Sequence, residues 1–132
     1  MFHEIKTPKD IQIFYEKTNL LHDGYIISVR YTNNSVKKTE YGHSLSPWAT
    51  TLSLCVLVTS LFDTIVELEF DCLYEWQLKD EYYSSVCGIF EATLSFDDQG
   101  HIIFSDDVWH NVTELKKHSY VIAESMKWRM IV

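Results

Sequence analysis

The most constraining feature of this 132-residue sequence is a long alternation of apolar and polar residues between Val66 and Leu78. Successive side chains of a β-strand point to opposite faces, so a period of two predicts a half-buried strand. The apolar row is Val66, Leu68, Phe70, Cys72, Tyr74, Trp76 and Leu78, and the acidic row is Glu67, Glu69, Asp71 and Glu75. We therefore expect the apolar row to face the core and the acidic row to face solvent.

Further strands are predicted by other apolar and alternating runs. The runs are 25–31, 52–58, 90–96, 102–104 and 120–132, and the turn between the third and fourth is Asp97-Asp98-Gln99-Gly100. In the first run Tyr25, Ile27, Val29 and Tyr31 are expected to share one face, and in the third run Phe90, Ala92, Leu94 and Phe96 are expected to point inward. Residues 32–49 are polar and irregular, and no structure is predicted for them.

Helical signals occur at two places. Thr7 is a good N-cap, Pro8 suits the first helical position, and Ile11 and Phe14 lie on one face of a helix reaching about Asn19. A capping box at 111–114 predicts a second, very short helix. The expected fold is mainly β (α+β), with an antiparallel, curved sheet of about six or seven strands and an N-terminal amphipathic helix. No repeat or linker divides the chain, so residues 1–132 are expected to form a single domain.

The expected location is the cytoplasm. No apolar run approaches the length of a membrane span, and the first residues lack the pattern of an export signal. Cys55, Cys72 and Cys87 form no C-x-x-C pair and lie in apolar runs, which favours buried reduced thiols over disulfides or a metal site. No cofactor is predicted, because the glycines are isolated and no G-x-S-x-G motif occurs.

Charge is distributed unevenly along the chain. The net charge is −8, yet residues 63–107 hold 12 acidic groups and only one basic group, Lys79. This balance argues against nucleic acid as a partner and favours a basic protein. The predicted partner-binding residues are Glu67, Glu69, Asp71 and Glu75. The alternative is that these acids form a solvated face that prevents sheet aggregation. A homodimer joined through a sheet edge is compatible with either interpretation.

The segment from Leu20 to Tyr31, with the order Leu-Leu-His-Asp-Gly-Tyr-Ile-Ile, resembles the opening of small bacterial β-rich proteins of unknown function. Some of those proteins are similar to immunity proteins that neutralise polymorphic toxins. The resemblance implies a β-rich fold, a non-enzymatic role and a protein partner. It supplies no catalytic residues.

His22 and Asp23 also suggest an enzyme, because metal-dependent phosphohydrolases use an adjacent His-Asp pair with further ligands. His43, His101, His110 and the pair Asp106-Asp107 are candidates for those ligands. The sequence favours a structural role instead, in which Asp23 bonds backbone amides or the His22 ring at the start of a strand. The loop tryptophans Trp48 and Trp109 are candidates for an interface or for burial under a loop.

Overall fold

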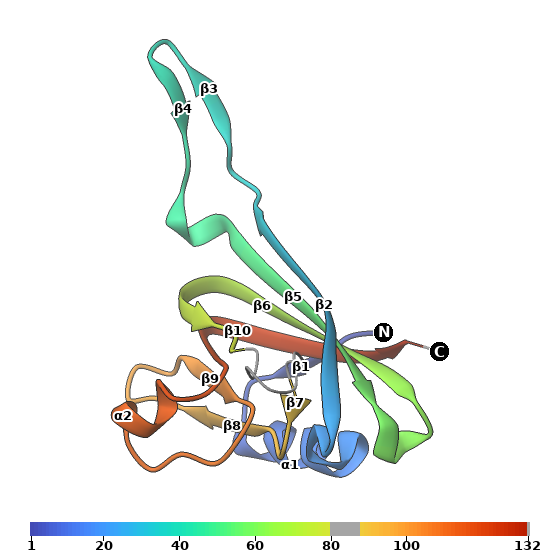
Figure 1. Ribbon diagram of the computed structural model, residues 1–132. Coiled ribbons are helices and arrows are strands. Elements are labelled where there is room, and N and C mark those ends of the chain that lie inside the picture. The colour runs from blue at the N-terminus through green and yellow to red at the C-terminus, as the bar shows by residue number, and fades with distance from the viewer. Residues whose placement is uncertain (80–87, 132) are drawn as a thin grey trace.

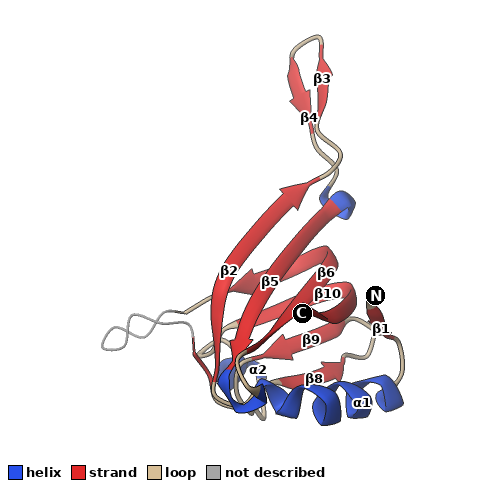
Figure 2. Cartoon of the chain, turned by 90° about the vertical axis from the view of Figure 1, so that its right-hand side faces the viewer, coloured by secondary structure: helices blue, strands red, loops and turns tan. Residues whose placement is uncertain are grey.

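A computed structural model describes residues 1–79 and 88–131, and it has one large antiparallel sheet. The strand order is β7-β2-β5-β6-β10-β9-β8, and the short β1 pairs with β10 as an eighth strand. The bounds are β1 His3–Ile5, β2 Gly24–Asn33, β5 Thr50–Val58, β6 Thr64–Gln77, β7 Gly88–Ile89, β8 Thr93–Phe96, β9 Ile102–Ser105 and β10 Tyr120–Ile131. The sheet curls strongly (Figures 1 and 2), which confirms the predicted mainly β class with a curved antiparallel sheet.

The predicted N-terminal helix is present as α1 (Pro8–Thr18) and continues into the 3-10 turn η1 (Asn19–Leu21). Thr7 and Asp10 form a capping box, in which the Asp10 N–H donates to Thr7 Oγ1 at 3.2 Å. Asn19, with φ of 53°, ends the helix in the left-handed conformation. The buried face of α1 places Phe14 edge-on against the Trp128 ring, 5.5 Å away.

The core lies on the face of the sheet that α1 covers, which we call the inner face. Leu52, Leu54 and Val56 of β5 meet Val66, Leu68 and Phe70 of β6 in register. A second, smaller cluster lies on the opposite side of β9 and β10 and contains Ile103, Leu115 and Tyr120, with Leu115 contributed by α2 (Val112–Leu115). Asn111 caps the N-terminus of that short helix, as its capping pattern predicted, and its Oδ1 accepts the Glu114 N–H at 3.0 Å.

Two irregularities break the predicted alternating rows. In β2 the register with β5 shifts between Ile26 and Ser28. Ile26 therefore packs against the core. The prediction that Tyr25, Ile27, Val29 and Tyr31 all share one face of the strand is wrong. In β6 the register with β10 shifts beside Leu73, just after Cys72 takes a φ of 58°. Leu73 therefore packs against the core and Tyr74 is exposed, contrary to the predicted apolar row.

Two further details differ from the sequence-based expectation. Phe90 is exposed, because strand β8 begins only at Thr93, whereas Ala92 and Leu94 are buried as predicted. Cys55 and Cys72 are free thiols, and Cys87 lies outside the described residues. Within residues 1–79 and 88–131, no helix has the length and apolar character needed to cross a membrane.

The irregular region 32–49 forms a projecting hairpin. Strands β3 (Lys37–Thr39) and β4 (Gly42–Ser44) pair with each other, and all their residues are exposed. This hairpin, residues 34–45, is called the arm below, and it extends from the end of the sheet opposite α1 (Figure 2). At its base Asn33 Nδ2 donates to the Ser46 carbonyl at 2.9 Å, and the 3-10 turn η2 (Pro47–Ala49) leads into β5.

Candidate functional site

The predicted acidic row lies on the outer face of the sheet, opposite the core, but its first member is not solvent-facing. Glu67 has only 8% of its surface exposed. Its carboxylate accepts hydrogen bonds from Arg129 Nε at 2.9 Å and from Ser53 Oγ at 3.2 Å. Arg129 lies directly opposite on β10, and Ser53 comes from β5, so the two neighbouring strands neutralise and bury this carboxylate.

The next two acids of the row are also paired. Glu69 forms an ion pair with Lys127 at 2.9 Å, and this hydrogen bond raises the pKa of the Lys127 ammonium despite partial burial. Asp71 accepts a hydrogen bond from Thr51 Oγ1 at 2.9 Å. The Phe2 ring covers both Lys127 and Arg129, with cation to ring-centroid distances of 4.9 and 4.4 Å. On the outer face, the carboxylates of Glu67, Glu69 and Asp71 are therefore all bonded to side chains of neighbouring strands and are not free.

Glu75 is separated from the other three acids by the irregularity in β6. Its carboxylate accepts a hydrogen bond from the Tyr120 hydroxyl at 2.8 Å, and Lys116 Nζ lies 3.7 Å away. Burial and the bond to Glu75 raise the pKa of Tyr120 to about 12. Glu75 thus anchors the smaller core cluster to β6, and the four predicted residues do not form one continuous docking row.

His22 and Asp23 lie where η1 gives way to β2, as the sequence predicted. His22 Nδ1 is 2.8 Å from the Phe90 carbonyl oxygen, and His22 Nε2 is 3.4 Å from Asp23 Oδ2. Both ring nitrogens therefore have partners within the protein. In the parts of the chain that are described, no group of three His, Cys, Asp or Glu side chains is placed to hold a metal ion. The enzyme hypothesis gains no support from this geometry.

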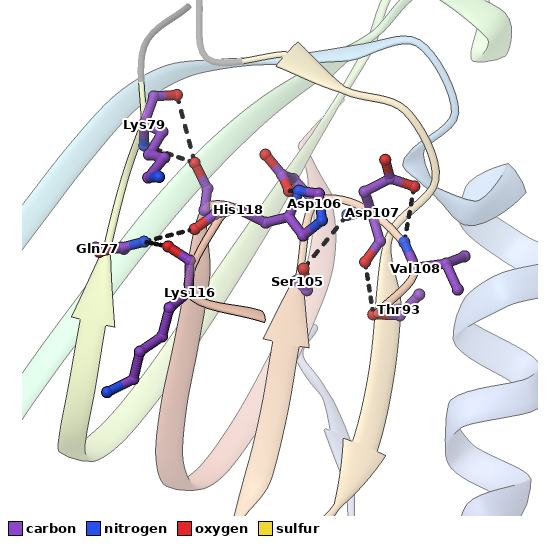
Figure 3. Close-up of polar contacts among 10 residues, drawn as sticks. Gln77, Lys79, Thr93, Ser105, Asp106, Asp107, Val108, Lys116 and His118 are labelled. Carbon is purple, nitrogen blue, oxygen red and sulfur yellow. Dashed lines mark hydrogen bonds and ion pairs between the residues drawn. The ribbon is translucent and has the colours of Figure 1, made fainter. Parts of the chain in front are cut away.

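Asp106, which the sequence offered only as a candidate metal ligand, is half-buried in the structure. Its Oδ1 atom is buried without a hydrogen bond, and His118 Nδ1 lies 3.6 Å from it. Burial raises the pKa of Asp106, while contacts with Ser119 and His118 oppose the shift. Figure 3 shows this polar cluster, in which Gln77 Nε2 donates to the His118 carbonyl at 2.9 Å.

The cluster joins several segments that are distant in the sequence. The Lys79 N–H donates to Ser119 Oγ at 2.7 Å, and the Phe90 N–H donates to the Asp106 carbonyl at 3.1 Å. The Asp106 carboxylate and the His118 imidazole face each other at 3.6 Å. The adjacent Asp107 is tied to the backbone, because its Oδ1 accepts the Val108 N–H at 2.7 Å. The hydrogen bonds of the cluster hold the adjoining ends of β6, β9 and β10 together, which is a structural role.

One group of aromatic and apolar side chains in the described part of the chain was not predicted as a site. It lies at the base of the arm, and all of its members except Trp48 line a cavity of about 370 Å³. We call it the aromatic face and define it as Tyr31, Leu45, Trp48, Tyr74 and Trp76. Trp48 is 66% exposed and meets Tyr74 edge-on at 6.3 Å. The shift in β6 turns Tyr74 outward, and α1 lies at the far end of the sheet and leaves this end uncovered (Figure 2).

The sequence contained part of the signal for the aromatic face. Trp48 follows Pro47 in an irregular stretch, which identified it as an interface candidate, and the structure places it in the open. Trp76 packs against the core, as its place in the apolar row predicted, whereas Tyr74 is exposed because of the shift in β6. Comparison of the chain with protein-family models, curated proteins and solved structures found no match.

Proposed function

We propose that this chain is a non-catalytic interaction protein that binds a protein partner through its aromatic face. The observation that carries the proposal is the exposure of Tyr31 and Tyr74 at one cavity, with the exposed Trp48 ring edge-on against Tyr74. Contiguous apolar surface of this kind is uncommon on proteins that act alone, and tryptophan and tyrosine contribute most to binding energy at interfaces. Binding of this type requires no cofactor.

The partner is expected to be basic. The chain has a net charge of −8, and a field of that sign accelerates encounter with a positively charged protein. Because Glu67, Glu69 and Asp71 are paired within the sheet, we assign them to this long-range attraction rather than to direct contact. An immunity-like inhibitor that blocks a basic toxin is one protein that would use such a surface.

The first test is affinity capture with the tagged full-length chain, comparing the double variant Trp48→Ala, Tyr74→Ala with the wild type. The matched control is Phe62→Ala, which removes a 99% exposed aromatic ring from the turn at the other end of β5. The captured protein is then identified, purified and titrated against each variant. We expect the double variant to weaken binding at least tenfold, equivalent to about 1.4 kcal/mol, and the control to bind like the wild type.

Two results would count against the proposal. The first is a captured protein that binds the double variant with wild-type affinity. The second is a protein lost equally on Phe62→Ala, which would indicate nonspecific adhesion of exposed rings. The expected basic character has its own measurement, since the association rate should fall as the screening length shortens from roughly 10 Å at 0.1 M salt to 3 Å at 1 M.

A further inference from the structure

The cavity of the aromatic face is bordered by rings that the fold itself holds in place. Tyr31 stacks on Trp76, with ring centroids 6.1 Å apart. Tyr74 stacks on His101, with centroids 4.1 Å apart, and Asp97 Oδ2 lies 3.0 Å from His101 Nδ1. Tyr31, Tyr74 and Trp76 all line the cavity. Because these rings are ordered by contacts within the protein, a ligand that binds among them pays little for ordering them.

The charges around the cavity favour a positively charged occupant. In the described part of the chain, none of the residues that line the cavity is charged, so its ring faces are not shared with a lining lysine or arginine. Desolvation raises the pKa of the Tyr74 hydroxyl, and the nearby carboxylates of Glu124 and Asp97 raise it further. The same carboxylates make the potential at this ring negative, and the net charge of −8 acts in the same direction over longer distances.

We propose that the cavity takes one arginine side chain of the basic partner, with the guanidinium stacked among the rings of Tyr31, Tyr74 and Trp76. The inference rests on the proposed function, because it names the group of the partner that enters the aromatic face. Tryptophan and tyrosine rings attract a cation that lies within about 6 Å of the ring centroid. Arginine fits better than lysine, because its planar guanidinium stacks on aromatic faces and is more weakly hydrated than an ammonium group.

The rest of the cavity suits the remainder of an arginine side chain. Leu45 and Leu73 line the same cavity as the three rings. Arginine commonly packs its methylene stem along apolar surface while its charged head contacts polar or aromatic groups. The phenol oxygens of Tyr31 and Tyr74 can also accept hydrogen bonds from guanidinium N–H groups. The site therefore has separate places for the stem and for the head.

The test requires no identified partner, because the full chain can be titrated with short peptides. The probe is acetyl-Gly-Arg-Gly-amide, and the matched control peptide carries citrulline, which has nearly the same shape as arginine but no charge. Binding is followed by NMR at the indole N–H of Trp76, with the buried Trp128 as internal reference. We expect the arginine peptide to shift the Trp76 signal saturably in the millimolar range, and the citrulline peptide to bind about tenfold more weakly.

Variants of one tyrosine separate attraction by the ring from apolar contact. Tyr31→Leu keeps an apolar side chain but removes the ring, and it should weaken the arginine peptide about tenfold with little effect on the citrulline peptide. Tyr31→Phe restores a ring face and should restore the binding. Tyr25→Leu is the matched control, since Tyr25 is 41% exposed on the same strand and is not among the residues that line the cavity. An unshifted Trp128 signal shows that each variant is folded.

Three results would overturn the proposal. Equal affinities for the two peptides would show that the cavity recognises shape rather than charge. Arginine binding that survives Tyr31→Leu would show that the rings do not hold the cation. The third is a Trp76 signal that does not respond up to the solubility limit of the arginine peptide. If Tyr31→Leu disturbs the Trp128 signal, Tyr74→Leu replaces it, with the same loss expected.

Failure of this inference is distinguishable from failure of the proposed function. The peptide titration reports on the cavity alone, whereas affinity capture with the Trp48→Ala, Tyr74→Ala variant reports on docking of the whole partner. A partner that is lost on the double variant, combined with equal binding of the two peptides, would overturn the arginine site and leave the proposed function standing. A partner that binds the double variant normally would count against the proposed function, whatever the peptides show.

Discussion

Tyr31 of β2 and Trp76 of β6 stack with their ring planes inclined by 23°, although strand β5 lies between their strands. The contact is possible because β6 extends beyond the start of β5 and bends after Cys72. The same bend exposes Tyr74 and opens the cavity beside Leu45. One local irregularity in β6 thus creates the surface to which we assign partner binding.

Phe70 tests the core. Its side chain is fully buried and lies 5.7 Å from the Phe104 ring, at the centre of the inner face. Phe70→Ala should lower the free energy of unfolding by about 3 to 5 kcal/mol, because a large cavity is left behind. Phe62→Ala, at a nearly fully exposed ring, should change it by less than about 0.5 kcal/mol in the same urea titration. Similar losses for the two variants would contradict the assigned core.

Gly24 tests the close packing at the start of β2. A Cβ atom built on Gly24 would lie 2.8 Å from both the Leu21 carbonyl oxygen and a Val56 methyl group. Gly24→Ala should therefore destabilise the protein by about 1 to 3 kcal/mol through overpacking. Gly88→Ala, where a Cβ meets nothing within 4 Å, is the matched control in thermal unfolding. If Gly24→Ala left the thermal stability unchanged, η1 and Val56 would have to lie farther from Gly24 than this close packing implies.

Glu67 tests whether the acidic row is structural. Replacing Glu67 by Gln removes the charge that accepts the bond from Arg129, and the free energy of unfolding should fall by about 1 to 3 kcal/mol. The solvent-exposed Glu124, changed to Gln, should have little effect. Consequently, reversing Glu67 and Glu69 to Lys should damage the fold itself, contrary to the expectation from sequence that both face solvent. A fully stable double reversal would restore the acidic row as a free docking surface.

The pH dependence of stability tests the role of Asp106 in the polar cluster with His118 and Ser119. Burial raises the pKa of its carboxyl above the ordinary value of 3.8, so between the two values the folded state binds more protons than the unfolded state. The contribution of Asp106 to stability therefore declines as pH rises through its raised pKa. Asp106→Asn removes this decline, and the variant should gain stability relative to the wild type as pH increases from 3 toward 7. If the free energies of unfolding of the wild type and of Asp106→Asn, measured by chemical denaturation, changed in parallel with pH, the raised pKa of Asp106 would be refuted.

The strands were predictable because alternation reports one buried face, and the caps of α1 and α2 were predictable because they depend on residues three positions apart. The positions of the shifts at Ile26 and Leu73 were not. Cys72, Leu73 and Tyr74 interrupt the alternation as three consecutive apolar residues, but such a run does not show which residue is the extra one. The pairing of Glu67 with Arg129 depends on β6 and β10 being neighbours, and no local sequence signal specifies that order. These nonlocal features decide which residues of β6 are free to bind.

Site-specific photo-crosslinking tests the central claim most directly. Benzoylphenylalanine is introduced at position 48 of the full chain, and separately at position 62 as a more exposed aromatic control, and each chain is irradiated in its own cells. The account predicts one defined adduct with a second, basic protein from position 48 and none from position 62. No adduct at position 48, or the same adducts from both positions, would contradict the claim that the aromatic face is a protein-binding surface.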